Sequence, residues 1–206
     1  MLVCTDGSKG TWDPDADPAD LVATRQAEQR DAAAALGATG EVVFLGRVDG
    51  DLVADRDAIS EVARWVRRLG PDVLLGHDPW RRHRLHPDHR AAGTVVVEAL
   101  VGARDPHFFP EHGLAPHRPA ALLLFEADRV DHVEVAEEPH VEAKVAALEA
   151  HRSQYASTMF ISDDDPEGAA AEQERFRRRI RDEVATVGRV VGRTAAEGFA
   201  RLATDR

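Results

Sequence analysis

Short, uninterrupted apolar runs separated by helical stretches are the feature of this sequence that most limits its fold. Four such runs lie within residues 1–5, 41–46, 72–76 and 121–127, and residues 132–136 offer a further candidate strand. Strands that are apolar throughout, rather than at alternate positions, are typical of parallel sheets that helices cover on both faces. The order of strands and helices along the chain therefore predicts an α/β fold with a mostly parallel sheet.

The expected helices are marked by residues that start and stop them. Asp17 followed by Pro18 is typical of a helix N-terminus, and this helix is expected to run to Leu36. Residues 55–70 repeat apolar side chains at helical spacing and end in Gly70, a common helix terminator. Further helices are expected at 89–103, 139–156 and 168–203, the last as a C-terminal helix of a single domain that spans residues 1–206.

Charge and cysteine content exclude several classes of protein. The chain carries 26 basic and 37 acidic residues, a formal net charge of −11, which argues against binding to nucleic acid or to anionic lipid. Acidic residues cluster at 13–20 and 163–168, where solvated loops are expected. Cys4 is the only cysteine, and no apolar run approaches the length of a membrane span, so a cytoplasmic location is expected.

A histidine-rich segment, "GHDPWRRHRLHPDHRAAG" at residues 76–93, follows the third apolar run. In parallel sheets, ligands bind beyond the carboxyl ends of the strands, where this segment begins. Pro87 suits the first turn of a helix, so His86 and His89 share one face, with Asp88 between them to orient a ring. Such imidazoles bind metals or act as general acids, although histidines in arginine-rich loops are also often only solvated. His77 fits loop-shaping hydrogen bonds and site lining equally well.

Five segments in this order resemble the PIG-L/LmbE-like de-N-acetylases, which are zinc hydrolases that remove acetyl groups from N-acetylglucosamine-type conjugates. The chain is similar to this family over nearly its whole length, and the resemblance implies a Rossmann-like sheet. The matching segments are "CTDGSKG" (4–10), "TRQAEQRDAAAALG" (24–37), "FLGRVDGDL" (44–52), "HPDHR" (86–90) and "KVAALEAHRSQ" (144–154).

The resemblance implies a role for five residues in hydrolysis of an acetamide to acetate and a free amine. His89 matches the family's zinc ligand. His86 matches the histidine that stabilises the oxyanion and protonates the leaving amine, and Asp88 would hold its ring in position. Arg25 and Asp49 match positions that the family uses near the sugar hydroxyls. The implied substrate is an N-acetylated amino sugar or its conjugate, and the implied cofactor is Zn²⁺, with Fe²⁺ suited to similar ligands.

One departure from the family pattern concerns the metal site. The family's first strand ends in His-Pro-Asp-Asp, which supplies two zinc ligands and the base, and no such motif occurs in this sequence. The expectation is therefore a domain that lacks the family's first strand. Either the recorded start is wrong or trimmed, or the short form has lost hydrolysis and acts as a sugar-binding or scaffold protein. The sequence specifies neither the acetylated substrate nor the oligomeric state.

Overall fold

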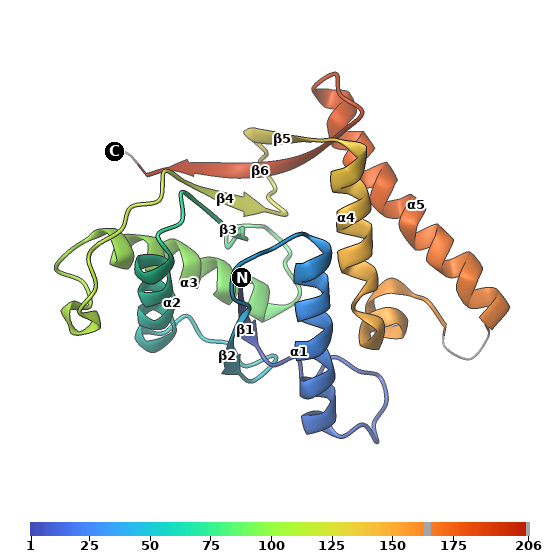
Figure 1. Cartoon of the computed structure of the whole chain (residues 1–206), viewed down its shortest axis with the longest axis horizontal. Coiled ribbons are helices and arrows are strands. Elements are labelled where there is room, and N and C mark those ends of the chain that lie inside the picture. The colour runs from blue at the N-terminus through green and yellow to red at the C-terminus, as the bar shows by residue number, and fades with distance from the viewer. Residues whose placement is uncertain (163–165, 205–206) are drawn as a thin grey trace. The chain divides into compact units, whose positions relative to one another are not determined.

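A computed structural model describes residues 1–162 and 166–204 of the chain (Figure 1). The residues form two compact units. The first unit combines residues 1–49 with 134–197, and the second combines residues 50–133 with the chain end from residue 198. The chain passes from one unit to the other three times, so neither unit is a continuous stretch of sequence.

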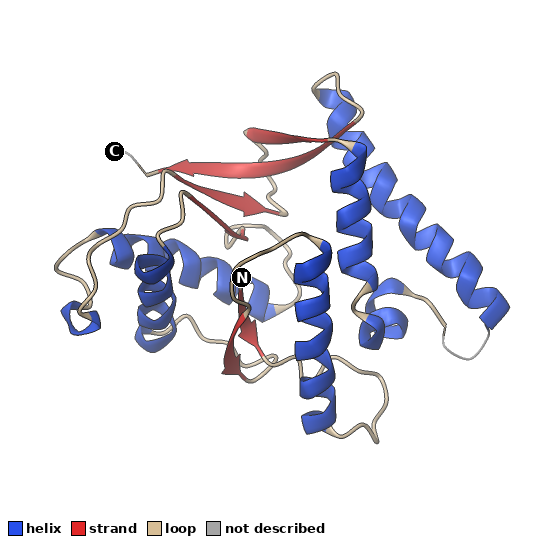
Figure 2. Ribbon diagram, viewed as in Figure 1, coloured by secondary structure: helices blue, strands red, loops and turns tan. Residues whose placement is uncertain are grey.

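The first unit contains a small parallel sheet and most of the helical C-terminal half (Figure 2). In the sheet, Leu2 of one strand lies opposite Val43 of the other. Asp17 caps the first helix by accepting hydrogen bonds from the next backbone N–H groups, as its sequence predicts. The elements of this unit are β1 (Leu2–Thr5), α1 (Pro18–Ala35), β2 (Val43–Arg47), α4 (Glu138–Glu149), η2 (Arg152–Gln154), η3 (Tyr155–Met159) and α5 (Pro166–Val190).

The second unit is built around a four-stranded sheet with the strand order β3-β4-β6-β5. Strands β3 and β4 are parallel, whereas β4 and β6 are antiparallel. Its elements are α2 (Arg56–Leu69), β3 (Val73–His77), α3 (Pro87–Arg104), η1 (Pro110–His112) and β4 (Ala121–Phe125), and β5 (His132–Ala136) and β6 (Ala195–Ala203) run across the boundary of the unit. Parallel strand pairs with helices between them confirm the predicted α/β fold class.

The core of the second unit lies between α3 and the sheet. Leu122 and Leu124 of β4 are completely buried and pack with Leu100 of α3. Burying each such leucine contributes about 1.5–3 kcal/mol to the free energy of unfolding. The uninterrupted apolar run of β4 is therefore explained by burial along nearly its whole length, as the sequence pattern predicts.

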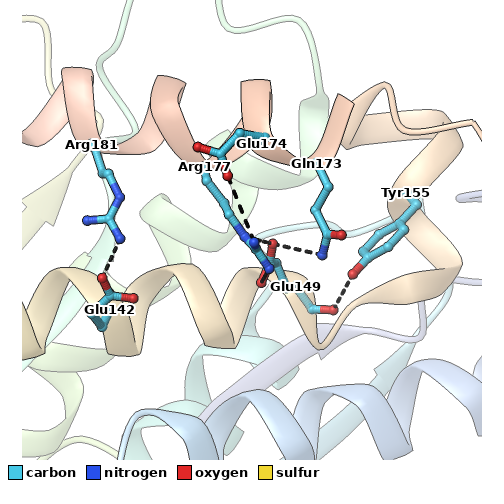
Figure 3. A network of polar contacts seen from close by, with 7 residues as sticks. All are labelled: Glu142, Glu149, Tyr155, Gln173, Glu174, Arg177 and Arg181. Carbon is cyan, nitrogen blue, oxygen red and sulfur yellow. Dashed lines mark hydrogen bonds and ion pairs between the residues drawn. The ribbon is translucent and has the colours of Figure 1, made fainter. Parts of the chain in front are cut away.

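In the first unit, α4 and α5 are joined by an apolar cluster and by the polar contacts that Figure 3 shows. Val145, Met159, Ile161, Phe176 and Ile180 form the apolar cluster. The Arg177 side chain donates two hydrogen bonds to the Glu149 carboxylate, from Nε at 2.7 Å and from Nη2 at 3.1 Å. These contacts fix the end of α4 against α5.

The prediction of one helix over residues 168–203 is wrong. Helix α5 ends at Val190, and Ala195–Ala203 forms β6, which pairs with β4. The chain turns sharply at Gly192, whose φ of 68° is a left-handed conformation that favours glycine. The segments before and after this turn pack so tightly that a Cβ at Gly188 would lie 2.8 Å from the Ala195 backbone. Hydrogen bonding within the sheet overrides the helical propensity of this alanine-rich segment.

The longest described helix, α5, is polar and carries the charged sequence "RFRRRIRDE". Among the described residues, no helix combines the length and the apolar character that crossing a membrane requires. Of the acidic run at 163–168, expected to be a solvated loop, residues 163–165 lie outside the described residues, whereas residues 166–168 form the start of α5.

Candidate metal centre

The start of α3 brings two histidines together in the second unit. His86 is the N-cap residue, Pro87 is the first helical residue, and Nδ1 of His86 accepts a hydrogen bond from the Asp88 backbone N–H at 3.3 Å. The ring centroids of His86 and His89 are 5.2 Å apart, with 29° between the ring planes. The spacing of three residues thus places both imidazoles on one side of the helix, as predicted.

Two strand ends add a third histidine and a carboxylate. His77 at the end of β3 lies opposite Phe125 at the end of the parallel strand β4, so Glu126 emerges at the same edge of the sheet. Nδ1 of His77 is 3.3 Å from Oε2 of Glu126, and the His77 ring stacks on His89 with centroids 4.3 Å apart. Glu126 has a φ of 55°. This conformation costs a non-glycine residue about 1–2 kcal/mol, and such strain occurs often at functional sites.

Arg84, from the histidine-rich loop, lies where these side chains converge. Its side chain is only 7% exposed. Nη1 of Arg84 donates to Nδ1 of His89 at 3.0 Å, approaches Nδ1 of His77 at 3.4 Å and forms an ion pair with Glu126. On the solvent side, Nη1 of Arg81 is 3.6 Å from Oε1 of Glu126. Three potential metal ligands therefore surround one buried guanidinium group.

The surroundings set the protonation states of these groups. Burial, reinforced by the neighbouring His89, lowers the pKa of His77 to about 4. Burial and the charge of Arg84 also lower the pKa of His89. Burial opposes the ionisation of Glu126, but the hydrogen bond and charge of Arg84 outweigh it and lower the pKa of the carboxyl group. Neutral imidazoles and an ionised carboxylate are the forms that bind a metal cation.

The donor set formed by these side chains fits a divalent transition metal. His77, His89 and Glu126 each offer one ligand atom, and these atoms lie within 4.8 Å of one another. Two imidazole nitrogens and one carboxylate oxygen are a common ligand set for catalytic zinc, and they also suit Fe²⁺. The structure thus surrounds the predicted ligand His89 with two further candidate ligands.

Asp88 is buried, at 5% exposure, and connects the start of α3 to the turn at residues 50–52. Its carboxylate accepts hydrogen bonds from the backbone N–H of Gly50 at 2.7 Å and of Leu52 at 3.2 Å. One of its oxygens also lies within 4.8 Å of a ring nitrogen of His86. The carboxylate is therefore fixed close to the imidazole that it is expected to hold in position, and that role stays a prediction.

The two residues predicted to bind sugar, Arg25 and Asp49, both belong to the first unit. Nη2 of Arg25 donates to the Gly10 carbonyl at 2.8 Å, and a Cβ at Gly10 would collide with the guanidinium. Burial lowers the pKa of Arg25, and the charge of Asp49 opposes this shift. The Asp49 backbone N–H donates to Oδ1 of Asp6 at 3.0 Å, and its carboxylate accepts from the Lys9 N–H at 3.3 Å. The loop after β1 and the turn after β2 are thereby joined.

Glu126 and Arg84 are the two residues of this centre that the sequence interpretation missed. A signal for Glu126 was present, because it directly follows the apolar residues 121–125, just as His77 directly follows the apolar run at 72–76. No comparable signal marks Arg84, because the loop contains several arginines in similar surroundings. Which arginine turns inward is decided by tertiary packing.

Comparisons with known proteins find a family match in the N-terminal part of the chain. The family described as "PIG-L: GlcNAc-PI de-N-acetylase" matches residues 1–100. Diacetylchitobiose deacetylase of Thermococcus kodakarensis is 31% identical over 158 residues, which cover 75% of this chain and 58% of that protein. A 1D-myo-inositol 2-acetamido-2-deoxy-alpha-D-glucopyranoside deacetylase of Frankia casuarinae is 32% identical over 138 residues, covering 49% of this chain and 44% of that protein. The chain thus spans about half the length of these relatives.

A solved structure shows the same fold. The N,N'-diacetylchitobiose deacetylase from Pyrococcus horikoshii, complexed with an inhibitor, superposes with a TM-score of 0.82 at 25% sequence identity. The match covers 98% of this chain and 72% of that one. The relatives that the chain resembles in sequence and in structure are therefore deacetylases, named for derivatives of N-acetylglucosamine. The match of the PIG-L family model to residues 1–100 confirms the family resemblance inferred from the motifs of the chain.

Proposed function

We propose that the chain is a zinc-dependent deacetylase that hydrolyses the acetamide of an N-acetylated amino sugar or its conjugate. The products would be acetate and a free amine. The observation that carries this proposal is the convergence of His77, His86 and His89 beside the Glu126 carboxylate at the carboxyl ends of two parallel strands. The acidic chain is proposed to act in the cytoplasm on a small sugar substrate, not on nucleic acid or at a membrane.

The roles follow from the protonation and the positions of the side chains. His89 is the proposed metal ligand, and zinc held there would polarise the acetamide carbonyl and make water nucleophilic near neutral pH. Nδ1 of His86 accepts the Asp88 N–H, which leaves the ring proton on Nε2. From Nε2, His86 would donate a hydrogen bond to the developing oxyanion. To protonate the leaving amine, the ring would first take up at Nδ1 the proton that the attacking water gives up, so that imidazolium donates the Nε2 proton and returns to neutral imidazole. Asp88 would hold this ring in its orientation.

Substrate recognition is assigned to two residues of the first unit. Arg25 and Asp49 supply a guanidinium donor and a carboxylate acceptor, which together suit the hydroxyl groups of a sugar. The names of the relatives support diacetylchitobiose and inositol-linked N-acetylglucosamine as the first compounds to assay.

The function is tested by measuring acetate release from the zinc-loaded chain with a panel of N-acetylglucosaminides. We expect release from at least one compound and a rate about 10²–10⁴ times lower for His86→Gln, the usual contribution of a general acid. His83→Gln is the matched control, because His83 lies in the same loop with an exposed side chain. Absence of acetate from every compound, or full activity of His86→Gln, would contradict the proposal.

A second candidate function is sugar binding without catalysis, in a protein that has lost hydrolysis. The burial of Arg84 among the three potential ligands favours this alternative, because a guanidinium already neutralises the carboxylate there. Metal content separates the two functions. A deacetylase should hold about one zinc ion per chain, whereas a sugar-binding protein should hold none and should bind the same sugars without releasing acetate.

A further inference from the structure

Three side chains with metal-binding atoms meet at the edge of the second unit's sheet. His77 ends β3, Glu126 directly follows β4, and His89 lies in the first turn of α3. Regular elements hold ligands more precisely than loops do, because their backbones are fixed by hydrogen bonds. The three donor atoms are thus held within 4.8 Å of one another by two strand ends and a helix.

A positive charge is already present at the point where these donors meet. Nη1 of Arg84 lies 3.0 Å from Nδ1 of His89 and 3.4 Å from Nδ1 of His77, and it is paired with Glu126. Nε and Nη2 of Arg84 are buried and have no hydrogen-bond partner within residues 1–162 and 166–204. A guanidinium binds best when its whole fork is paired, so Arg84 matches this site through one nitrogen only.

We propose that His77, His89 and Glu126 bind one divalent cation of the zinc type, and that Arg84 is an internal cation that fills this site until the metal replaces it. The catalytic use of the bound metal rests on the proposed deacetylase function. Binding itself is argued from the donors. His77 and Glu126 would complete a three-ligand site together with the predicted ligand His89.

Arg84 and a metal ion cannot share the site. Zinc binds imidazole nitrogen at about 2.0–2.1 Å, so the two rings would have to close by about 1 Å for His89 and about 1.4 Å for His77 from their present distances to Nη1. The metal would then occupy the position of Nη1, and the two positive charges would repel each other strongly in a partly buried site. Arg81 is different, because its side chain is 40% exposed and it contacts Glu126 from the solvent side. Metal binding should therefore displace Arg84 and leave Arg81 in place.

The first experiment measures the affinity of the full chain for Zn²⁺ by competition with a chromophoric chelator. We expect Arg84→Gln to bind Zn²⁺ about tenfold more tightly than the wild type, because a hydrogen bond to a charged group no longer has to be broken first. Arg81→Gln is the matched control and should stay within about threefold of the wild type. Equal affinity of Arg84→Gln and the wild type would overturn the role of Arg84.

The second experiment tests the ligands and does not depend on whether Arg84→Gln folds. His77→Gln and Glu126→Gln should each weaken Zn²⁺ binding by about tenfold or more, and each should weaken the visible absorption of the Co²⁺-loaded chain. His83→Gln should change neither measurement, and circular dichroism checks that every variant is folded. If Glu126→Gln and His77→Gln bind metal as the wild type does, the ligand set is wrong.

Failure of this proposal is distinguishable from failure of the deacetylase function. If the chain binds Zn²⁺ as described but releases no acetate, the metal site stands and the proposed deacetylase function is wrong. If the chain releases acetate but substitutions of Arg84, His77 and Glu126 leave its affinity for Zn²⁺ unchanged, the deacetylase function stands and the proposed metal site is wrong.

Discussion

At the scale of single residues, Arg67 shows how a buried charge can hold irregular backbone in the second unit. It is 8% exposed, and its guanidinium donates to the carbonyl groups of five residues, Gly102, Ala103, Asp105, Phe108 and Phe109. These carbonyls belong to the end of α3 and the loop that follows it. We expect Arg67→Met to lower the free energy of unfolding by about 3 kcal/mol or more, because buried carbonyls lose their donors. Urea unfolding measures this loss.

Arg68→Met is the control at the neighbouring position. Arg68 is exposed and contacts only the face of Trp65, at 4.7 Å from the ring centroid, among the interactions described for it. Its replacement should cost less than about 1 kcal/mol. Equal losses for the two variants would show that the hydrogen bonds of Arg67 do not stabilise the fold.

At the scale of elements, the position of a strand in its sheet decides what its leucines contribute. Leu122 of β4 lies in a strand that is flanked on both sides and is fully buried, whereas Leu75 of the outer strand β3 is 59% exposed. We expect Leu122→Ala to cost about 3–5 kcal/mol of unfolding free energy, and Leu75→Ala less than about 1 kcal/mol. Urea unfolding of the two variants provides the comparison. A larger loss for Leu75→Ala would mean that β3 is covered in solution.

At the scale of the whole molecule, partly buried histidines make stability depend on pH. Burial lowers the pKa of His77, His89, His112 and His151. Below their ordinary pKa near 6.5, the unfolded chain takes up protons that the folded chain does not, so stability falls as pH falls from about 6.5 towards 4. For His77, with a pKa of about 4, the free energy of unfolding at pH 5 is about 2 kcal/mol lower than at pH 7.5. The urea midpoint of the metal-free chain should be lower at pH 5 than at pH 7.5.

Two variants connect this pH dependence to its cause. His77→Gln should reduce the difference between the two urea midpoints, whereas His83→Gln, at an exposed position, should leave it unchanged. A midpoint that is unchanged or higher at pH 5 would contradict the sign of the expected effect.

Much of the molecule could be predicted because the relevant signals are local. The apolar runs predict the first four strands, residues 132–136 were a candidate for the fifth, Asp17 and Gly70 mark helix ends, and the three-residue spacing brings His86 and His89 together. Each of these features depends on residues that are close together in sequence, so hydrophobic periodicity and capping residues indicate it directly. The α/β fold class and the histidine pair were thus determined by the sequence alone.

Only the tertiary structure decided which distant residues meet. Residues 195–203 read as helix, yet they form a strand because β4 offers them an antiparallel partner more than 70 residues away in sequence. Glu126 stands beside His77 because of the register between two parallel strands, and Arg84 turns inward because a carboxylate and two imidazole nitrogens meet there. Register and burial arise between segments that are far apart in the chain, and no local pattern of residues encodes them.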